Sequence, residues 1–281
     1  MHDKSILVTG CSSGIGRCVA LGLRDRGYRV FATARRDQDI ARLEQSGLTA
    51  IRLHVDDPAS VADAASQVLA ASAGHVYGLF NNAAYGQPGA VEDLSWEALE
   101  AQLRTNVLGW HELTRRLIPG MRERGEGRII QNSSVLGLVV MPYRGAYNCS
   151  KFALEGLSDT LRLELHGSGV WVSLIEPGPI SSRFRENAHA KFKQYIDAEN
   201  SVHRDNYRAM QQRLEKQGPT TGFTLPPEAV LKKVIHALES PRPRARYAVT
   251  TPTYIFAALR RLLSTRQLDW VLRKASGGGG R

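Results

Sequence analysis

The sequence predicts an α/β protein of one domain, in which helices cover both faces of a doubly wound parallel sheet, a Rossmann fold. Six apolar strand-like segments alternate with helical segments between residues 5 and 176, which is the pattern of a parallel sheet with right-handed crossovers. The first strand runs directly into a glycine-rich turn, as in dinucleotide-binding units. With 281 residues, 42% of them hydrophobic, the chain can bury a full core without a second domain.

The first strand is expected at residues 5–8, and the turn at residues 9–16 separates it from a helix that contains residues 19–23. The remaining segments follow from apolar runs and helical periodicity. Strands are expected at 28–33, 48–55, 76–82, 127–133 and 170–176, and helices at 58–71, 94–121 and 146–165. Such sheets bind ligands at the carboxyl ends of their strands, where Thr9, Ala34, Asn81, Ser134 and Pro177 fall.

The last third of the chain is less regular. A polar stretch at about residues 183–225 has patches of helical periodicity and predicts a helical lid over the substrate site. A helix at 228–238 and a short strand at 246–249 complete a domain of residues 1–250. Residues 251–281 predict a C-terminal extension, consisting of a basic amphipathic helix at 253–274 and a disordered end, S-G-G-G-G-R.

The arrangement of strand, glycine-rich turn and helix brings backbone N–H groups and a helix N-terminus to a phosphate. Gly10 can form the tight turn, Gly14 lets the backbone approach a pyrophosphate, and Gly16 lets the helix pack closely on the strand. The spacing is not G-x-G-x-x-G, so on this segment alone an ordinary glycine-containing loop remains an equal interpretation.

The end of the second strand predicts the form of the cofactor. An acidic residue there would hold ribose hydroxyls, but Ala34 occupies the position and is followed by Arg35 and Arg36. Guanidinium groups match the geometry of a 2′-phosphate, so NADP(H) is favoured over NAD(H). The alternative is that the two arginines only solvate a loop.

Tyr147 and Lys151 are four residues apart, so a helix through both would place their side chains one turn from each other. An ammonium group there favours the phenolate and is expected to lower the tyrosine pKa from its ordinary value near 10. Ser134 follows the apolar run at 128–131, where a strand end directs its hydroxyl at the same point. A hydroxyl donor and a tuned phenol can move a proton on and off a carbonyl oxygen.

Together these motifs make the chain similar to the short-chain dehydrogenase/reductase family over about residues 5–250. The resemblance rests on T-G-x-x-x-G-x-G at 9–16, N-N-A at 81–83, Asn106, Ser134 thirteen residues before Tyr147, Y-x-x-x-K at 147–151 and P-G at 177–178. It implies that Ser134 orients the carbonyl, that Tyr147 exchanges its proton, and that Lys151 binds the nicotinamide ribose. Asn106 would hold a water in a proton relay.

The resemblance also implies the cofactor site. Asn81 would support its floor, and Ile180 and Ser182 would face the nicotinamide amide. The expected cofactor-binding residues are Gly10, Ser12, Ser13, Gly14, Ile15, Gly16, Arg35, Arg36, Val55, Asn81, Ala83, Tyr147, Lys151, Pro177, Gly178, Ile180 and Ser182.

This sequence departs from the family pattern in two places. The adenine-contacting Asp of the family aligns with His54, which puts that contact in doubt although Asp56 and Asp57 are close by. Ser182 replaces the usual Thr and keeps the hydroxyl. The glycine turn, the A-T-A-R-R strand end and the C-terminal extension are most similar to the branch acting on steroids, retinoids and long-chain aldehydes.

The formal charge of +10 is concentrated at the C-terminus. Residues 240–281 hold eight Arg and one Lys against one Asp, a net charge of +8, so the body is nearly neutral and no nucleic acid is expected as a partner. Three cysteines without metal-ligand spacing fit a reduced cytoplasmic protein with no metal site. The apolar stripe Ile255, Phe256, Leu259, Leu262, Leu263 and Trp270 either packs on protein or lies on an anionic membrane surface.

The resulting hypothesis is an NADP(H)-dependent oxidoreductase that interconverts a carbonyl and an alcohol. The alternative is a catalytically silent NADP(H)-binding regulator. Lid residues suggest an elongated apolar substrate such as a steroid, retinoid or long-chain aldehyde, although the same residues could pack the lid on the body; they are Phe184, Phe192, Tyr195, Ile196 and Phe223. The family usually pairs its two long helices, here 94–121 and 146–165, so a homodimer or homotetramer is expected.

Overall fold

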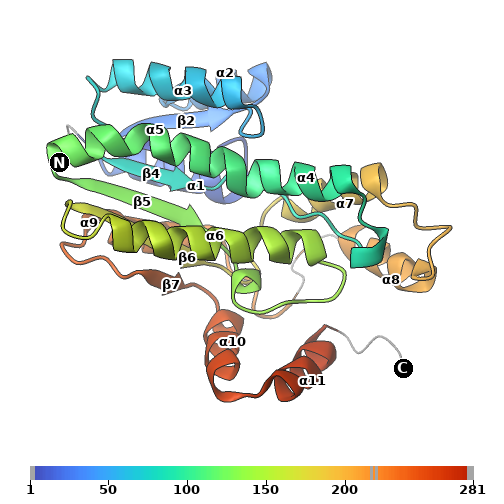
Figure 1. Ribbon diagram of the computed structural model, residues 1–281. Helices are drawn as coiled ribbons and strands as arrows, with labels where there is room; N and C mark the ends of the chain where they lie inside the picture. The colour runs from blue at the N-terminus through green and yellow to red at the C-terminus, as the bar shows by residue number, and fades with distance from the viewer. Residues whose placement is uncertain (1–3, 216–217, 219–220, 277–281) are drawn as a thin grey trace.

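A parallel β-sheet with the strand order β3-β2-β1-β4-β5-β6-β7 forms the centre of the protein (Figure 1). The computed structural model describes residues 4–215, 218 and 221–276. Every strand in this part of the chain pairs in parallel with its neighbours, as the alternating pattern predicts. The strands are β1 Ser5–Val8, β2 Arg29–Ala34, β3 Thr49–Arg52, β4 Gly78–Asn81, β5 Gly127–Asn132, β6 Val170–Glu176 and β7 Arg246–Ala248.

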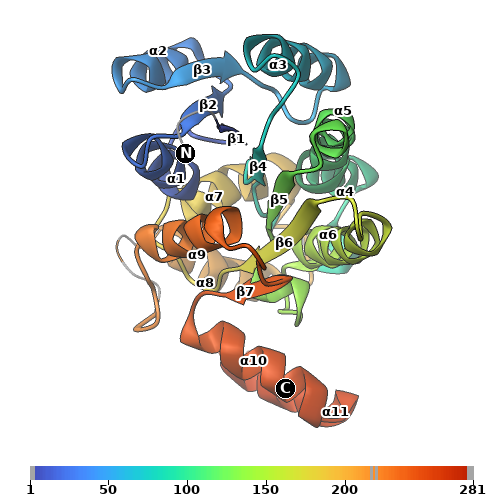
Figure 2. The ribbon, with the colours of Figure 1, turned by 90° about the vertical axis from the view of Figure 1, so that its left-hand side faces the viewer.

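Helices cover both faces of the sheet, which explains why its central strands are apolar runs and do not alternate. Figure 2, viewed along the strands, shows α1, α2 and α9 on one face and α3, α5 and α6 on the other. Each layer encloses its own apolar core. The helices on the first face are α1 Gly14–Asp25, α2 Asp37–Gln45 and α9 Glu228–Glu239, and those on the second are α3 Pro58–Ala71, α5 Gly109–Arg124 and α6 Gly145–Glu164.

The long helix expected at residues 94–121 is interrupted. It consists of α4 Trp96–Leu103, a π-helical turn at Arg104–Leu108, and α5. A π-turn inserts an extra residue into the helical ladder and often marks a functional position. Here the turn contains Asn106, one of the predicted catalytic residues, and buries it completely.

The predicted lid is helical and lies beyond the carboxyl ends of the strands (Figure 1). It contains α7 Phe184–Tyr195 and α8 Arg204–Glu215, which enclose a third apolar cluster. Tyr207 at its centre is fully buried, accepts a hydrogen bond from the backbone N–H of Ala90 at 2.9 Å, and donates one to Asp93. A short 3₁₀ turn, Val91–Asp93, therefore anchors the lid to the body.

The C-terminal extension differs from the single helix expected at residues 253–274. Two helices are present, α10 Thr251–Leu262 and α11 Thr265–Ala275, because Leu263 is extended and Ser264 forms a capping box with Gln267. Both lie at the β7 edge, apart from the two helical layers (Figure 2). The predicted disordered end falls, from residue 277 on, outside the described residues. No helix in the described part of the chain is long and apolar enough to cross a membrane.

Candidate active site

A large cleft lies where the strands end and the lid begins. It encloses about 1940 Å³, and its walls come from the glycine-rich turn, the ends of β2, β4, β5 and β6, the start of α6, the lid, and α10 with the last residue of α11. A cavity of this size has room for more than one small molecule. Its position at the carboxyl ends of the strands is where parallel sheets bind their ligands.

The glycine-rich turn is shaped for close approach. Gly10 has a φ of +72°, and a Cβ at this position would lie 2.8 Å from the Cα of Ala83. A Cβ on Gly16 would lie 2.2 Å from the carbonyl oxygen of Gly10, so only glycine lets α1 begin this close to β1. Thr9 keeps the turn in place by accepting hydrogen bonds from the backbone N–H groups of Asn82 and Ala83 at 2.7 and 3.0 Å. The exposed backbone here fits a pyrophosphate at a helix N-terminus.

Most of the predicted cofactor-binding residues line this cleft. They are Gly10, Ser12, Ser13, Gly14, Ile15, Arg35, Val55, Ala83, Tyr147, Lys151, Pro177, Gly178, Ile180 and Ser182. Gly16, Arg36 and Asn81 are not among the lining residues. Gly16 contributes because it has no side chain, which lets α1 begin close to β1. The side chains of Arg36 and Asn81 bond to other residues of the protein instead.

The two arginines at the end of β2 have different surroundings. Arg36 donates from Nε to Asp39 at 2.8 Å and lies at the start of α2. Arg35 lines the cleft, and within the described residues no ion pair is formed by its side chain. Of the two predicted phosphate ligands, Arg35 is the one whose side chain borders the cofactor cleft.

The two asparagines that follow β4 also differ. Asn81 is fully buried behind the cleft and donates to Thr114 at 3.0 Å. Asn82 lines the cleft and donates to the carbonyl oxygens of Thr9 and Gly10. Asn82 thus holds the glycine-rich turn directly, a role that the sequence prediction did not assign to it, although it stands next to the predicted residue in the same N-N-A motif.

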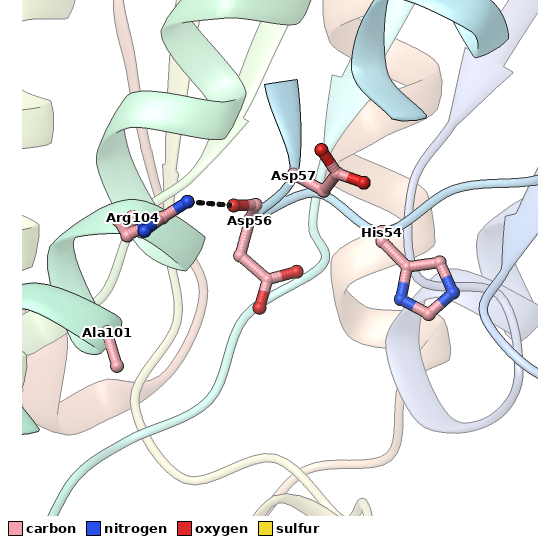
Figure 3. Close-up of a pocket in the computed structure, with 5 residues that line it drawn as sticks. All are labelled: His54, Asp56, Asp57, Ala101 and Arg104. Carbon is pink, nitrogen blue, oxygen red and sulfur yellow. Dashed lines mark hydrogen bonds between the residues drawn. The ribbon is translucent and has the colours of Figure 1, made fainter. Parts of the chain in front are cut away.

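His54, where the sequence departs from the family pattern, does not line the main cleft but lies in a small neighbouring pocket. Asp57 accepts a hydrogen bond from the N–H of Ala59 at 3.0 Å as the N-cap of α3. Asp56 lines both the main cleft and a small polar pocket with His54, Asp57, Ala101 and Arg104. Figure 3 shows Arg104 bonded to the backbone carbonyl of Asp56, while the Asp56 carboxylate extends freely beside it. Asp56, unlike Asp57, therefore keeps a carboxylate available to the cleft.

Tyr147 lies in the wall of the cleft at the first turn of α6 and is 8% exposed. The hydroxyl of Ser134 lies beside its phenol group and lowers the phenol pKa against the larger, raising effect of burial. Ser134 is held at the end of β5, where its Oγ accepts from the N–H of Leu136 at 3.1 Å. Phe184 of the lid packs edge-on against the Tyr147 ring, with centroids 5.4 Å apart. The tertiary structure therefore brings Ser134 and Tyr147 together at the point where the lid closes.

Lys151 lies one turn further along α6 and is 1% exposed. Its Nζ donates to the backbone carbonyl of Asn132 at 2.8 Å and lies 4.5 Å from the Trp110 ring centroid. Burial lowers the pKa of Lys151 to about 7, although Glu155 acts in the opposite direction. The ammonium group is therefore held in place without a directly paired carboxylate.

The expectation that Lys151 lowers the pKa of Tyr147 is not met in this structure. Burial raises the pKa of Tyr147 to about 12, and the hydrogen bond with Ser134 and the charge of Arg144 only partly oppose it. Low-dielectric surroundings penalise every ionised group, so the burial that positions the pair also disfavours its phenolate. Tyr147 is consequently a neutral phenol at pH 7, ready to donate a proton.

Asn106 is buried below the cleft. Its Nδ2 donates to the carbonyl of Tyr85 at 2.9 Å and to the Oγ of Ser150 at 3.1 Å, and its Oδ1 accepts from the N–H of Tyr85 at 3.3 Å. It thereby joins the π-turn, the loop after β4 and the catalytic helix α6. Its expected part in a proton relay stays a prediction.

A partly buried ionic network lies beneath Lys151. The guanidinium of Arg246 on β7 pairs with Glu155, with Glu176 at 2.8 Å and with Asp159 at 2.6 Å. Ser133 also donates to Glu155. Burial raises the pKa of both Glu155 and Glu176, and Arg246 opposes this in each case. The network is formed by residues far apart in the chain, and sequence reasoning did not identify it.

Comparison with known proteins gives consistent matches. Residues 4–193 match the family described as short chain dehydrogenase. An uncharacterized oxidoreductase of Escherichia coli K12, YbbO, is 44% identical over 96% of this chain and 94% of its own length. Human 17-beta-hydroxysteroid dehydrogenase type 1 is 34% identical over 89% of this chain and 78% of its own. A short chain dehydrogenase/reductase from Burkholderia phymatum, solved with NAD, superposes with a TM-score of 0.78 at 26% identity, covering 96% of this chain and 95% of that one.

Proposed function

The chain belongs to the short-chain dehydrogenase family of oxidoreductases, and we propose that it interconverts a ketone or aldehyde with the corresponding alcohol, using NADP(H). The observation that carries this proposal is the convergence of Ser134, Tyr147 and Lys151 in one cleft with a glycine-rich turn whose backbone is open to a pyrophosphate. The cleft fits a dinucleotide because the space at Gly10 and Gly14 exists only without side chains.

In the reducing direction, the chemistry needs a proton for the oxygen of the carbonyl. The bound nicotinamide would supply the hydride. Tyr147, which is protonated at neutral pH, donates the proton, and the Ser134 hydroxyl holds the same oxygen in position. Lys151 lies one turn behind Tyr147, where an ammonium group can bind ribose hydroxyls. Together these residues orient the carbonyl and complete the proton transfer.

The choice of NADP(H) over NAD(H) rests on Arg35. A relative with the same fold binds NAD, so membership of the family does not select the cofactor. The Arg35 side chain borders the cleft at the end of β2, beside Ala34 where an acid would oppose a 2′-phosphate. Replacing it, Arg35→Asp, should reduce preference for NADPH over NADH by about tenfold to a hundredfold, the value of a charge-assisted contact. Arg36→Asp is the matched control, because Arg36 pairs with Asp39. Equal use of both cofactors by the unmodified protein would contradict the assignment.

The substrate is proposed to be mainly apolar, such as a steroid, a retinoid or a long-chain aldehyde. Support comes from Phe184, Tyr195 and Phe223 of the lid, which line the cleft. Phe192 and Ile196, in contrast, pack within the lid and take no part in the cleft. The similarity to a hydroxysteroid dehydrogenase points to the same class of substrate.

Tyr147→Phe tests the central proposal. This variant should bind NADPH as the unmodified protein does, since only the phenol oxygen is lost, but reduce no carbonyl in a panel of steroid ketones, retinal and long-chain aldehydes. Loss of NADPH absorbance measures turnover, and fluorescence titration measures binding. Substantial turnover by Tyr147→Phe would refute the role of the phenol. Cofactor binding without turnover by the unmodified protein would instead favour the silent regulator.

Two further proposals concern partners. Leu108 at the end of the π-turn directly before α5, and Leu157 and Leu163 on α6, are exposed, with 56%, 46% and 70% of their surface accessible. These apolar side chains support assembly into a homodimer or homotetramer through α5 and α6. Sedimentation at micromolar concentration that shows only a monomer would contradict this.

The second concerns the C-terminal extension. Leu262 and Trp270 are 78% and 55% exposed, and basic side chains surround them, which supports contact with an anionic membrane surface. The apolar side of α11 is partly used within the protein, because Leu272 is buried. Any membrane contact would therefore use the outward residues of α10 and α11.

A further inference from the structure

Arg144 is a cation in the wall of the cleft, directly before the first residue of the catalytic helix α6. It stands three residues before Tyr147, on the side of the cleft bordered by lid helix α8. Its Nη1 lies 3.4 Å from the carbonyl oxygen of Tyr143 and 3.4 Å from the sulfur of Met210. Both are weak, long contacts for a guanidinium group, which carries five donors.

Among the described residues, no carboxylate lies within ion-pair distance of Arg144. Two acids that line the same cleft have partners of their own: Glu186 pairs with Arg183 at 2.8 Å, and Glu215 lies 3.4 Å from His189. On the far side of the lid, Asp93 accepts hydrogen bonds from Ser201 and Tyr207. None of these carboxylates is free to turn toward Arg144 without losing its own partner.

The electrostatic position of Arg144 is unfavourable in the absence of a ligand. Burial, together with a smaller effect of the nearby cation Arg213, lowers the pKa of Arg144 to about 10. At neutral pH the group is nevertheless charged. Half-buried Arg246, in contrast, is paired with three carboxylates. A desolvated cation beside a second cation is the environment that an anionic ligand would complete.

Apolar side chains line the cleft as well, among charged and polar ones. Met141, Phe184 and Leu214 line the cleft together with Arg144. A ligand that satisfies both surfaces has an apolar body and one anionic group, and its reactive carbon lies near Tyr147. The Arg fork matches the planar geometry of a carboxylate, with two parallel hydrogen bonds.

We propose that Arg144 binds a carboxylate of the substrate, so that the preferred substrates of this enzyme are oxo acids, or the matching hydroxy acids, with an apolar chain. The inference rests on the proposed carbonyl reduction and adds a class of substrate to it. Arg144 is in this view a specificity-determining residue, because it binds the carboxylate of the substrate and not the reacting carbonyl.

The experiment compares ω-oxo acids of increasing chain length with their methyl esters, which carry the same aldehyde without the charge. The ratio of kcat/KM for acid over ester is the readout, because general damage to the cleft affects both members of a pair. In the unmodified protein, kcat/KM at the best chain length should be about tenfold to a hundredfold higher for the acid than for its ester, which is the value of a charge-assisted hydrogen bond. Arg144→Met should bring the ratio close to one, and Arg144→Lys should restore part of it.

Arg183→Met is the matched control. Arg183 also lines the cleft, but it has Glu186 as its partner, so the preference for acids should remain. A ratio near one in the unmodified protein at every chain length, or a preference that survives in Arg144→Met, would overturn the proposal. Turnover of esters without a preference for acids refutes this inference alone, whereas absence of turnover with every carbonyl refutes the proposed function.

A binding measurement tests the role of Arg144 in a second way. In the presence of NADPH, a long-chain alkanoate should raise the melting temperature of the unmodified protein and of Arg183→Met, but not that of Arg144→Met. This measurement does not depend on catalysis. Equal thermal shifts in all three proteins would also overturn the role of Arg144, while NADPH-induced stabilisation of Arg144→Met shows that the variant is folded.

Discussion

Glu155→Gln should lower the pKa of Lys151. Glu155 follows Lys151 by one turn of α6, and its charge raises the pKa of the lysine, which burial lowers to about 7. The carboxylate accepts a hydrogen bond from Ser133 and pairs with Arg246. Glutamine has nearly the same shape and can keep the contact with Ser133, so the substitution removes mainly the charge.

The size of the effect follows from the spacing on the helix. Side chains one turn apart have Cβ atoms about 6 Å from each other, and two unit charges at about 6 Å in an effective dielectric of about 20 interact by roughly 3 kcal/mol. That energy corresponds to about two pKa units. Because Arg246 neutralises part of the Glu155 charge, we expect the pKa of Lys151 to fall by about one unit.

The assay is the pH dependence of NADPH binding, followed by fluorescence, together with that of kcat/KM. A lysine with a lowered pKa loses its ammonium charge as the pH rises through that value, so binding that needs this charge weakens near pH 7 in the unmodified protein. In Glu155→Gln the same weakening should begin about one pH unit lower. The titration of Tyr147 does not interfere, since its pKa is about 12.

Glu176→Gln is the matched control for this prediction. Glu176 pairs with the same Arg246 at 2.8 Å, but it is not one of the groups that shift the pKa of Lys151. Its removal should therefore destabilise the network without moving the pH profile. The reasoning is wrong if both variants shift the profile equally, or if Glu155→Gln leaves it in place.

Three other perturbations have defined outcomes. Gly16→Ala places a Cβ 2.2 Å from the carbonyl oxygen of Gly10, so fluorescence titration should show loss of cofactor binding, and retained affinity would contradict the close packing of the turn. Asn106→Ala leaves the buried N–H of Tyr85 without its acceptor and removes one of the two donors to the Tyr85 carbonyl, the other being Gln102; it should lower the free energy of unfolding in urea by about 1–3 kcal/mol, and an unchanged midpoint would count against this. In flotation with anionic liposomes, the full chain should float with the vesicles, whereas a chain lacking residues 252–281 should not, and high salt should release the full chain from the vesicles. If the full chain stays in the soluble fraction at low salt, the C-terminal extension has a structural role only.

Much of the fold could be predicted from the sequence because its signals are local. Apolar runs and helical periodicity placed the strands and the main helices, including α3 and β6 at their observed bounds. The motifs also predicted that Ser134, Tyr147 and Lys151 face one cleft, because Ser134 follows a strand end and the helix that carries the other two begins at the same edge of the sheet. These predictions need only the period of each segment and the topology that follows from it.

Periodicity predicted the helices less well where a few residues decide whether a helix continues or is interrupted. The break between α10 and α11 depends on the N-cap at Ser264. The amphipathic pattern of the sequence continues across this residue and therefore predicts a single helix. The π-turn around Asn106 likewise lies inside a pattern that is helical throughout. In both places the local backbone is chosen by hydrogen bonds that periodicity does not describe.

The sequence by itself determined which chemical groups this protein has and which strand ends carry them; the tertiary structure alone decided their charge state and their partners. Lys151 was expected to lower the pKa of Tyr147, but burial of both groups opposes ionisation of each. Arg36 has an acid to pair with and Arg144 has none among the described residues. The physical reason is that desolvation and ion pairing depend on side chains brought close by folding, whose distances no spacing along the chain can specify.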